Sequence, residues 1–378
     1  MKFIHTGDLH IGKTINDFNL LKDQKFILDQ MIKIAKEEKV DAFVIAGDIY
    51  DRSIPSAEAV VLLDEFLSTL QKEDIKVFMI SGNHDSPERI SFGKKILEKQ
   101  GLFIQGIYEE PAIMNEVICK DEFGQVSFFF MPFVKPAVLN CKTSDEMIKF
   151  ILEHNCTTRE TDIRKVLISH FFVTNNGKEP ELSDSETTIH VGGLDNVEAS
   201  NFKDFDYVAL GHIHKPQQIG EGPIYYAGSP LKFSFSEVNQ CKSVNIVELR
   251  KKGEVIVKKR ELIPLHEMRK IKGLLDDLIK PEITLSQNCN DYLQITLINE
   301  EELLDPIGVL RNEYPNVMQL LLAKNESVLE GDYQNKILKR SKSPYELFED
   351  FYEIVRDKPM DDKRRSQVME AMKEAEER

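Results

Sequence analysis

Histidine and carboxylate side chains recur in short motifs along the first two thirds of the sequence. These side chains offer the nitrogen and oxygen ligands that divalent metal ions bind in proteins, and no thiolate belongs to the set. The motifs are, in chain order, Asp8-Leu9-His10, Gly47-Asp48-Ile49-Tyr50-Asp51, Gly82-Asn83-His84-Asp85, Ser169-His170 and Gly211-His212-Ile213-His214. Each motif alone occurs by chance in many proteins, but their order and placement together predict a metal centre.

The placement of the motifs indicates how they could meet. Each stands at or just after the carboxyl end of a short apolar run typical of a β-strand, and such ends line one edge of an α/β sheet. Between the first three runs, apolar residues recur every three or four positions over 20–39 and 56–71, which predicts two helices. The expected strands are KFIHT, AFVIAG, KVFMIS, VSFFFMPF, KVLISHFF, YVALG and SVNIVEL.

The residue types fit a two-metal phosphoesterase. Two divalent ions about 3.5 to 4 Å apart can clamp the attacking and leaving oxygens of an in-line displacement at phosphorus. This arrangement needs a bridging carboxylate, for which we expect Asp48. Manganese, iron, zinc and magnesium all remain open, although carboxylate and amide oxygens favour a harder ion. The histidines outside the motifs are expected to have structural or surface roles, and they are His5, His154, His190 and His266.

Composition limits the class of protein. A chain of 378 residues is too long for a single small hydrophobic core, so its length predicts a catalytic domain with smaller modules. The net charge of -15 argues against simple tight binding to nucleic acid, so DNA binding would need a local basic patch or a partner. We expect a cytoplasmic protein without a membrane segment. No run approaches the ~20 apolar residues of a membrane span, the first residues lack a secretory pattern, and five scattered cysteines form no CxxC pair.

The pattern of the predicted catalytic domain, 1–262, breaks at a proline-containing segment around 261–268. A small α/β cap domain is expected over 267–323, with a helix at 270–279, a strand at 292–298, a helix at Pro306–Glu313 and a strand at Val317–Leu322. A polar linker, 324–342, precedes a helical tail, 343–378, which opens with a capping box and a proline at the first helical position. Its apolar stripe either packs on its own protein or binds a partner.

The ordered motifs resemble the calcineurin-like metallophosphoesterase superfamily over the whole predicted catalytic domain. More narrowly, the chain resembles the family of nuclease subunits of bacterial SbcCD complexes, which are related to archaeal and eukaryotic break-repair nucleases. The stretches that carry this resemblance are GNHDSPERISFG, SHFFV, SDSE, VGGLDNV, FDYVALGHIHKPQ, GSPLKFSFSE and SPYELFEDFY. It implies an α/β sandwich of two mixed sheets flanked by helices, with the small cap domain and helical tail.

The resemblance also implies roles for single residues. One ion would be held by Asp8, His10, Asp48 and His214, and the other by Asp48, Asn83, His170 and His212. His84 would protonate the leaving oxygen or stabilise charge on the phosphate, with Asp85 orienting its ring. The nucleophile would be a water whose pKa the ions lower.

Three further positions remain less defined by the resemblance. Asp51 stands where archaeal relatives tend to have a second catalytic histidine, so it would support the site or orient water. Arg52 and Arg89 could contact substrate phosphates, although exposed arginines are more often only solvated.

The activity that the resemblance implies is that of a manganese-dependent DNA nuclease, a 3'-5' double-strand exonuclease and a hairpin and single-strand endonuclease. The tail would bind an SbcC-type coiled-coil ATPase, and a homodimer of nuclease subunits would form a heterotetramer with it. ATP would be the partner's substrate, because this chain has no G-x-x-x-x-G-K-[ST] loop. A stand-alone phosphoesterase for nucleotides or phosphoproteins is the enzymatic alternative. A scaffold without activity is disfavoured, because every proposed ligand is present.

Overall fold

The computed structural model describes residues 1–108, 113–155, 162–186, 195–284, 288–299, 301 and 303–323, with the single positions 348, 352, 360, 364, 365 and 368. The chain forms two compact units, one of Met1–Ile295 with Leu304–Leu320 and one of Thr296–Leu303 with Leu321–Arg378. The predicted linker 324–342 lies outside the described residues, as do nearly all of the predicted tail, Cys156 and His190. The fold that follows is that of the first unit.

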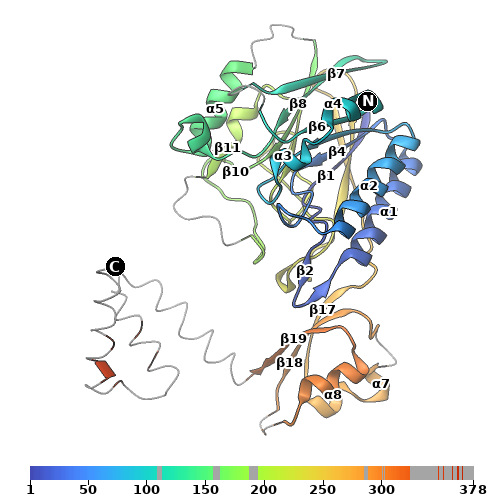
Figure 1. The fold of residues 1–378 in the computed structure, drawn as a ribbon, viewed down its shortest axis with the longest axis vertical. Helices are drawn as coiled ribbons and strands as arrows, with labels where there is room; N and C mark the ends of the chain where they lie inside the picture. The colour runs from blue at the N-terminus through green and yellow to red at the C-terminus, as the bar shows by residue number, and fades with distance from the viewer. Residues whose placement is uncertain are drawn as a thin grey trace. The chain divides into compact units, whose positions relative to one another are not determined.

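Two six-stranded mixed sheets form the body of this unit (Figure 1). The first has the order β16-β15-β1-β4-β5-β6, with strands at Val255–Glu261, Ser243–Leu249, Lys2–Thr6, Ala42–Ala46, Lys76–Ile80 and Leu102–Gln105. The second has the order β13-β14-β12-β9-β8-β7, with strands at Gln217–Gln218, Ile224–Tyr226, Tyr207–Gly211, Arg164–His170, Gly124–Met131 and Asn115–Asp121. In each sheet four neighbouring strands run parallel, which brings their carboxyl ends to one side.

The two sheets pack face to face through aromatic and β-branched side chains. Phe78 of the first sheet stacks on Phe128 of the second with ring centroids 4.2 Å apart, and Phe3 meets Phe128 edge-on at 5.7 Å. The other faces are covered by helices, because Ile4 and Phe43 share a core with α1 and α2, and Leu167 shares another with α5. Strands buried on both faces explain why these runs are continuously apolar. The predicted sandwich is therefore confirmed.

The two helices predicted between the first three strands are present. α1 (Leu21–Glu38) and α2 (Ala57–Lys72) confirm the two predicted helices, and Ser56 caps α2 by accepting a hydrogen bond from the Ala59 amide at 3.2 Å. The remaining short elements are α3 (Pro87–Ile90), α4 (Lys94–Leu97), α5 (Ser144–Asn155), β2 (Thr14–Ile15), β3 (Phe18–Asn19), β10 (Phe172–Thr174) and β11 (Asn196–Glu198). Within the described ranges, no helix has both the length and the apolar character to cross a bilayer.

The helix predicted over 270–279 is wrong for its first four residues. The chain forms strand β17 (Met268–Gly273) there, followed by the single turn α6 (Leu275–Leu278) and by α7 (Pro281–Thr284). Exposure alternates along β17, where Lys270 and Lys272 are exposed and the residues beside them are more buried, as in an edge strand. The lysines and leucines of this segment favoured a helix, but exposure repeats every two residues along β17, as it does in a strand.

The later elements of the predicted cap are confirmed as β18 (Tyr292–Leu297), α8 (Pro306–Glu313) and β19 (Val317–Leu322). They continue a three-stranded sheet of order β17-β18-β19. Residues on both sides of the proposed boundary at 262–267 belong to the same compact unit, so that boundary stays a prediction.

Candidate metal centre

The seven predicted ligands converge from both sheets rather than from the edge of one. Loops after β1, β4 and β5 bring four of them, and the ends of β9 and β12 bring the other three. Asp48 lies between the two groups. Its Oδ2 is 3.6 Å from His10 Nε2, which comes from the first sheet, and 3.4 Å from His170 Nε2, which comes from the second. This is the position expected of a bridging carboxylate.

The remaining ligand atoms gather on either side of Asp48. On one side His10 Nε2 is 3.2 Å from His214 Nε2, and Asp8 offers a carboxylate oxygen within 4.8 Å of both rings. On the other side Asn83 Oδ1 is 3.1 Å from His170 Nε2 and 3.0 Å from His212 Nδ1. The structure thus brings together the two sets of side chains that the resemblance implied.

Four of the ligands have backbone conformations that L-residues seldom adopt. The φ angles are 52° at Asp8, 44° at His10, 49° at Asp48 and 100° at His212. Such conformations cost about 1 to 3 kcal/mol each and persist where the surroundings hold them. Here the Asp8 amide donates to the Gly47 carbonyl at 3.1 Å, and the His10 amide donates to the Asp48 carbonyl at 3.0 Å. Other non-glycine residues of the described chain also have positive φ, but these four come together at one site.

Two glycines allow the close approach of these loops. A Cβ atom on Gly82 would lie 2.1 Å from Asp48 Oδ1, and one on Gly47 would lie 2.3 Å from His170 Nδ1. Gly47 also has a φ of +84°, which favours glycine. Any larger residue would displace the ligand that each glycine faces.

The donor set fits divalent cations. Asp8 Oδ2 is buried without a hydrogen-bond partner. Burying such an oxygen destabilises the folded state unless a cation or a hydrogen-bond donor binds it. His170 Nδ1 lies 2.7 Å from the Ala46 carbonyl, which can only accept, so Nδ1 carries the hydrogen and Nε2 keeps its lone pair in the neutral ring. That lone pair faces Asn83 and Asp48, as a metal ligand would.

Burial and neighbouring charges shift the pKa values of the ligands strongly. Burial raises the pKa of Asp8 to about 7 even though His170 and His214 oppose the shift. Burial also penalises the Asp48 carboxylate, but His170 and His10 outweigh it and hold the pKa of Asp48 well below its usual value. Burial lowers the pKa of His170, while Asp48 raises it to a net value of about 9. Burial therefore disfavours the charged form of Asp8, and divalent ions beside it would offset that cost.

His84 lies among the ligands, since a ring nitrogen of His84, one of His10 and a carboxylate oxygen of Asp48 lie within 4.8 Å of one another. Its amide donates to Asp48 Oδ1 at 2.9 Å, and its ring stands edge-on to that of His10 with centroids 4.7 Å apart. Nδ1 donates to the Asp51 carbonyl at 2.9 Å, because a carbonyl only accepts. The ring is therefore fixed with Nε2 as the nitrogen available to a substrate.

The prediction that Asp85 orients the His84 ring is wrong. The buried Asp85 carboxylate accepts hydrogen bonds from the backbone amides of Ile49 at 3.1 Å, Tyr50 at 2.9 Å and Gly82 at 2.9 Å. It ties the loop after β5 to the loop after β4. The main chain of Asp51 holds the histidine ring instead, so Asp85 positions the loops that carry the ligands.

Asp51 supports the site through its side chain as well. Its Oδ1 accepts a hydrogen bond from Lys13 Nζ at 2.7 Å and lies 3.6 Å from His10 Nδ1. Sequence reasoning missed Lys13, whose ammonium group also lies 5.3 Å from the centroid of the Phe233 ring. Arg52 is 79% exposed with Nε 3.8 Å from Asp51 Oδ2, and Arg89 is exposed on α3. The structure places both arginines at the surface, where their substrate contacts stay a prediction.

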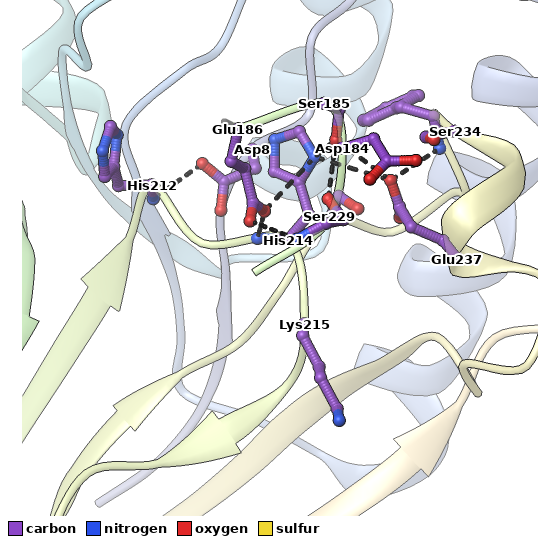
Figure 2. A network of polar contacts seen from close by, with 12 residues as sticks. Asp8, Asp184, Ser185, Glu186, His212, His214, Lys215, Ser229, Ser234 and Glu237 are labelled. Atoms are coloured by element: carbon purple, nitrogen blue, oxygen red, sulfur yellow. Dashed lines mark hydrogen bonds and ion pairs between the residues drawn. The ribbon is translucent and has the colours of Figure 1, made fainter. Parts of the chain in front are cut away.

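A second group of residues that the sequence did not single out surrounds His214 (Figure 2). The His214 amide donates to Glu186, and Ser185 Oγ lies 2.9 Å from His214 Nδ1. Glu237 and Lys242 complete this group. Every residue of this group except Lys242 lies in the stretch SDSE or the stretch GSPLKFSFSE. Both stretches carry the family resemblance, and this was the sequence signal that could have pointed to these residues.

The other described histidines lie apart from the ligand sets. His5 is buried between the sheets with Nδ1 2.9 Å from the Tyr207 hydroxyl. His154 Nδ1 donates to the Phe150 carbonyl at 2.7 Å within α5, and His266 Nδ1 is 2.9 Å from Asp23 Oδ1. These contacts are structural, as expected.

Two family models match this chain, and solved structures of phosphoesterases are similar to it. Residues 1–216 match the family model described as calcineurin-like phosphoesterase, and residues 264–356 match the model described as type 5 capsule protein repressor C-terminal domain. A dimetal phosphatase from Danio rerio shares 11% identity, with coverage of 70% of this chain and 96% of that one and a TM-score of 0.40. The phosphoesterase Yfce from E. coli shares 13% identity, with coverage of 66% and 88% and a TM-score of 0.28.

One sequence relative defines the family more closely. The SbcD subunit of the nuclease SbcCD from Staphylococcus epidermidis is 36% identical over 328 residues, which cover 85% of this chain and 85% of that protein. With the phosphoesterase match over the first 216 residues, this identity shows that the chain belongs to the SbcD family of metal-dependent nucleases, within the calcineurin-like phosphoesterases.

Proposed function

We propose that this chain hydrolyses phosphodiester bonds in DNA with two divalent metal ions, as the nuclease subunit of an SbcCD-type complex. Membership in the family supports the nuclease activity. The position of Asp48 carries the two-ion proposal, since its carboxylate lies within 3.6 Å of an imidazole nitrogen from each ligand set. One carboxylate between two sets of nitrogen and oxygen ligands is what a pair of ions acting on phosphate needs.

The two ions would be held by the two sets described above, with Asp48 in both. Bound there, they would polarise the phosphate and lower the pKa of the attacking water. Manganese is the ion we propose, because the carboxylate and amide oxygens of Asp8, Asp48 and Asn83 favour a hard ion while the imidazoles accept a transition metal.

His84 would act as the proton donor or charge stabiliser. The Asp51 carbonyl fixes the Nδ1 hydrogen, so in the protonated ring Nε2 carries a second hydrogen that can be donated to the leaving oxygen or to a phosphate oxygen. Lys13, held by the Asp51 carboxylate, adds a positive charge at the same side of the site. These residues act on the substrate without serving as ligands.

The acidic chain requires help to bind DNA. With a net charge of -15, we propose that an SbcC-type coiled-coil ATPase supplies much of the basic surface and is bound by the tail 343–378. We also propose that two nuclease subunits form a homodimer within a heterotetramer. Phe92 and Ile96 in the α3–α4 region are 84% and 73% exposed, and we place part of the contact between the two nuclease subunits at this pair.

The activity is tested by incubating labelled DNA hairpins and duplexes, and separately a generic phosphomonoester, with manganese and with or without the ATPase. The proposal predicts cleavage of the DNA and loss of that cleavage in Asp48→Ala. Turnover of the monoester alone, unaffected by the ATPase, would instead support the stand-alone phosphoesterase.

The partner proposal has its own test. A chain ending at residue 342 should keep manganese-dependent hydrolysis of short DNA but lose co-purification with the ATPase. Co-purification at the level of the full chain would show that the tail is not the binding segment.

A further inference from the structure

The ring of His214 is held from behind by a chain of buried side chains. Ser185 Oγ lies 2.9 Å from His214 Nδ1, on the side of the ring opposite to Nε2. The same hydroxyl donates to Glu237 Oε1 at 3.1 Å, and the Phe233 amide reaches that oxygen at 3.4 Å. Figure 2 shows Ser185 and Glu237 on one side of the imidazole and Asp8 near the other. We call Ser185, Glu237 and Lys242 the His214 support.

The direction of these hydrogen bonds fixes the tautomer of His214. A carboxylate only accepts, so the Ser185 hydroxyl hydrogen goes to Glu237, and Ser183 Oγ, 2.7 Å from Ser185 Oγ, is the donor in that contact. The Ser185 oxygen must then accept from His214, which places the ring hydrogen on Nδ1. In the neutral ring Nε2 therefore keeps its lone pair, and it points into the space shared with His10 Nε2, 3.2 Å away.

Lys242 connects the ring support to the main chain. Its Nζ pairs with Glu237 Oε2 at 2.5 Å and donates to the His214 carbonyl at 2.9 Å and to Ser229 Oγ at 3.0 Å. Lys242 is 4% exposed and Glu237 is fully buried, so the pair neutralises two charges that would be costly alone. One lysine thus fixes the backbone of His214 and the carboxylate that orients its ring.

The alternative orienting group is Glu186, and the distances argue against it. Its Oε1 lies 3.6 Å from His214 Nδ1, beyond hydrogen-bond range, and it accepts instead from the His214 amide. Glu186 therefore acts on the loop, and Ser185 is the direct partner of the ring.

We propose that the His214 support sets the affinity of one of the two ion sites, the one formed by Asp8, His10 and His214. This inference rests on the proposed two-metal function. The opposite site is held differently, because His170 Nδ1 donates to the main-chain carbonyl of Ala46, which no substitution of a side chain removes. Disrupting the His214 support should therefore weaken one ion site and spare the other.

The test is calorimetric titration of manganese into the metal-free full-length protein. Ser185→Ala should weaken one of two binding events by roughly 10- to 100-fold, the usual effect of losing a hydrogen-bond partner of a ligating histidine. The other event should stay at its wild-type affinity. Ser185→Thr, which keeps the hydroxyl, should restore most of the loss.

A matched control is Ser91→Ala. Ser91 Oγ also accepts a hydrogen bond, from the Gly106 amide at 3.1 Å, but it contacts none of the ligands. This variant should bind manganese like the wild type. Glu237→Gln provides a second change of the same support, with the expected loss again confined to one site.

Several outcomes would overturn the inference. Unchanged affinity at both sites in Ser185→Ala and Glu237→Gln would do so, as would an equal loss at both sites. Asp48→Ala, titrated in parallel, separates this result from failure of the metal centre. If Asp48→Ala keeps both binding events, the proposed centre is wrong. If it loses them while the Ser185 and Glu237 variants bind normally, only the support role is wrong.

Discussion

Each end of strand β9 carries a buried side chain with ring or guanidinium nitrogens, and the two side chains differ in the partners that they have. At the carboxyl end His170 faces Asp48 and Asn83, and nearby Asp8 Oδ2 is buried without a hydrogen-bond partner. At the amino end Arg164 is equally buried, but its terminal nitrogens donate to the Asp121 carboxylate and to the carbonyls of Gly124, Leu249 and Arg250. The metal end leaves a carboxylate oxygen of Asp8 unpaired, whereas at the other end both terminal nitrogens of Arg164 are hydrogen-bonded within the protein and only its Nε has no partner.

This difference separates function from stability within one sandwich. Strained backbone and unpaired oxygens at the metal end lower stability but prepare ligands, whereas the ion pair around Arg164 fixes β9 to β7 and β15. Substitutions at the metal end should therefore affect activity far more than folding. Substitutions around Arg164 should do the reverse.

Asp48→Ala should give the largest effect at the metal end. Removing the shared carboxylate should lower the rate of DNA cleavage on the order of a thousandfold or more, because the ions stabilise the transition state by several kcal/mol. The free energy of unfolding of the metal-free protein should change by only about 1 kcal/mol, since the lost contacts with the His84 amide, His10 and His170 are offset by removal of a buried charge. Cleavage assays and urea denaturation give the two values, and a comparable loss of stability would break the separation.

His84→Gln should lower cleavage by roughly 10²- to 10⁴-fold, the range for a lost general acid. Metal content should remain that of the wild type, because His84 is predicted to act on the substrate and not to bind an ion. Elemental analysis of the purified variant measures this content. If manganese disappears together with activity, His84 is a ligand and its assigned role is incorrect.

Arg164→Gln tests the opposite end. The free energy of unfolding should fall by about 2 to 3 kcal/mol, below the range for a fully buried pair because Asp121 retains contact with solvent. Manganese affinity and the cleavage rate of the folded protein should remain within about twofold of the wild type. A variant with normal stability but impaired metal binding would reverse the comparison.

The pH dependence of stability sharpens the same point and has the smallest expected effect. Partial burial favours the neutral Asp121 carboxyl, but Arg164 and the Met1 amine outweigh it and hold the pKa of Asp121 well below its usual range. Because the pKa of Asp121 is lower in the folded state than in the unfolded state, its charged form stabilises the fold. This stabilisation is complete above the pKa of the unfolded state, near 3.9, and is lost as the pH falls below that value. The difference in unfolding free energy between wild type and Asp121→Asn should be constant from about pH 5 to 7 and shrink toward pH 2. Urea midpoints across this range would contradict the account if the difference grew on acidification.

The metal ligands could be predicted because their signals are local in the sequence. Asp48 and Asn83 each follow a buried strand within three residues, and a glycine adjoins each of them. The strands themselves are continuous apolar runs, since both of their faces are covered. Family resemblance then divided the ligands into the two sets that the structure brings together.

The supporting contacts could not be predicted, because they join distant parts of the chain. Ser185 and Glu237 are 52 positions apart, and Lys242 reaches His214 across 28. Asp85 follows His84 directly, yet its carboxylate turns to the backbone amides of the preceding loop. Neither adjacency nor residue type shows which way a buried side chain points.

The central claim is that two ions share Asp48 at the metal end. Anomalous diffraction at the manganese edge, from crystals of the full chain grown with manganese, tests it most directly. We predict two peaks about 3.5 to 4 Å apart, one beside His10 and His214 and one beside His170 and His212, with Asp48 bonded to both. A single peak, or a second ion that Asp48 does not contact, would contradict the account.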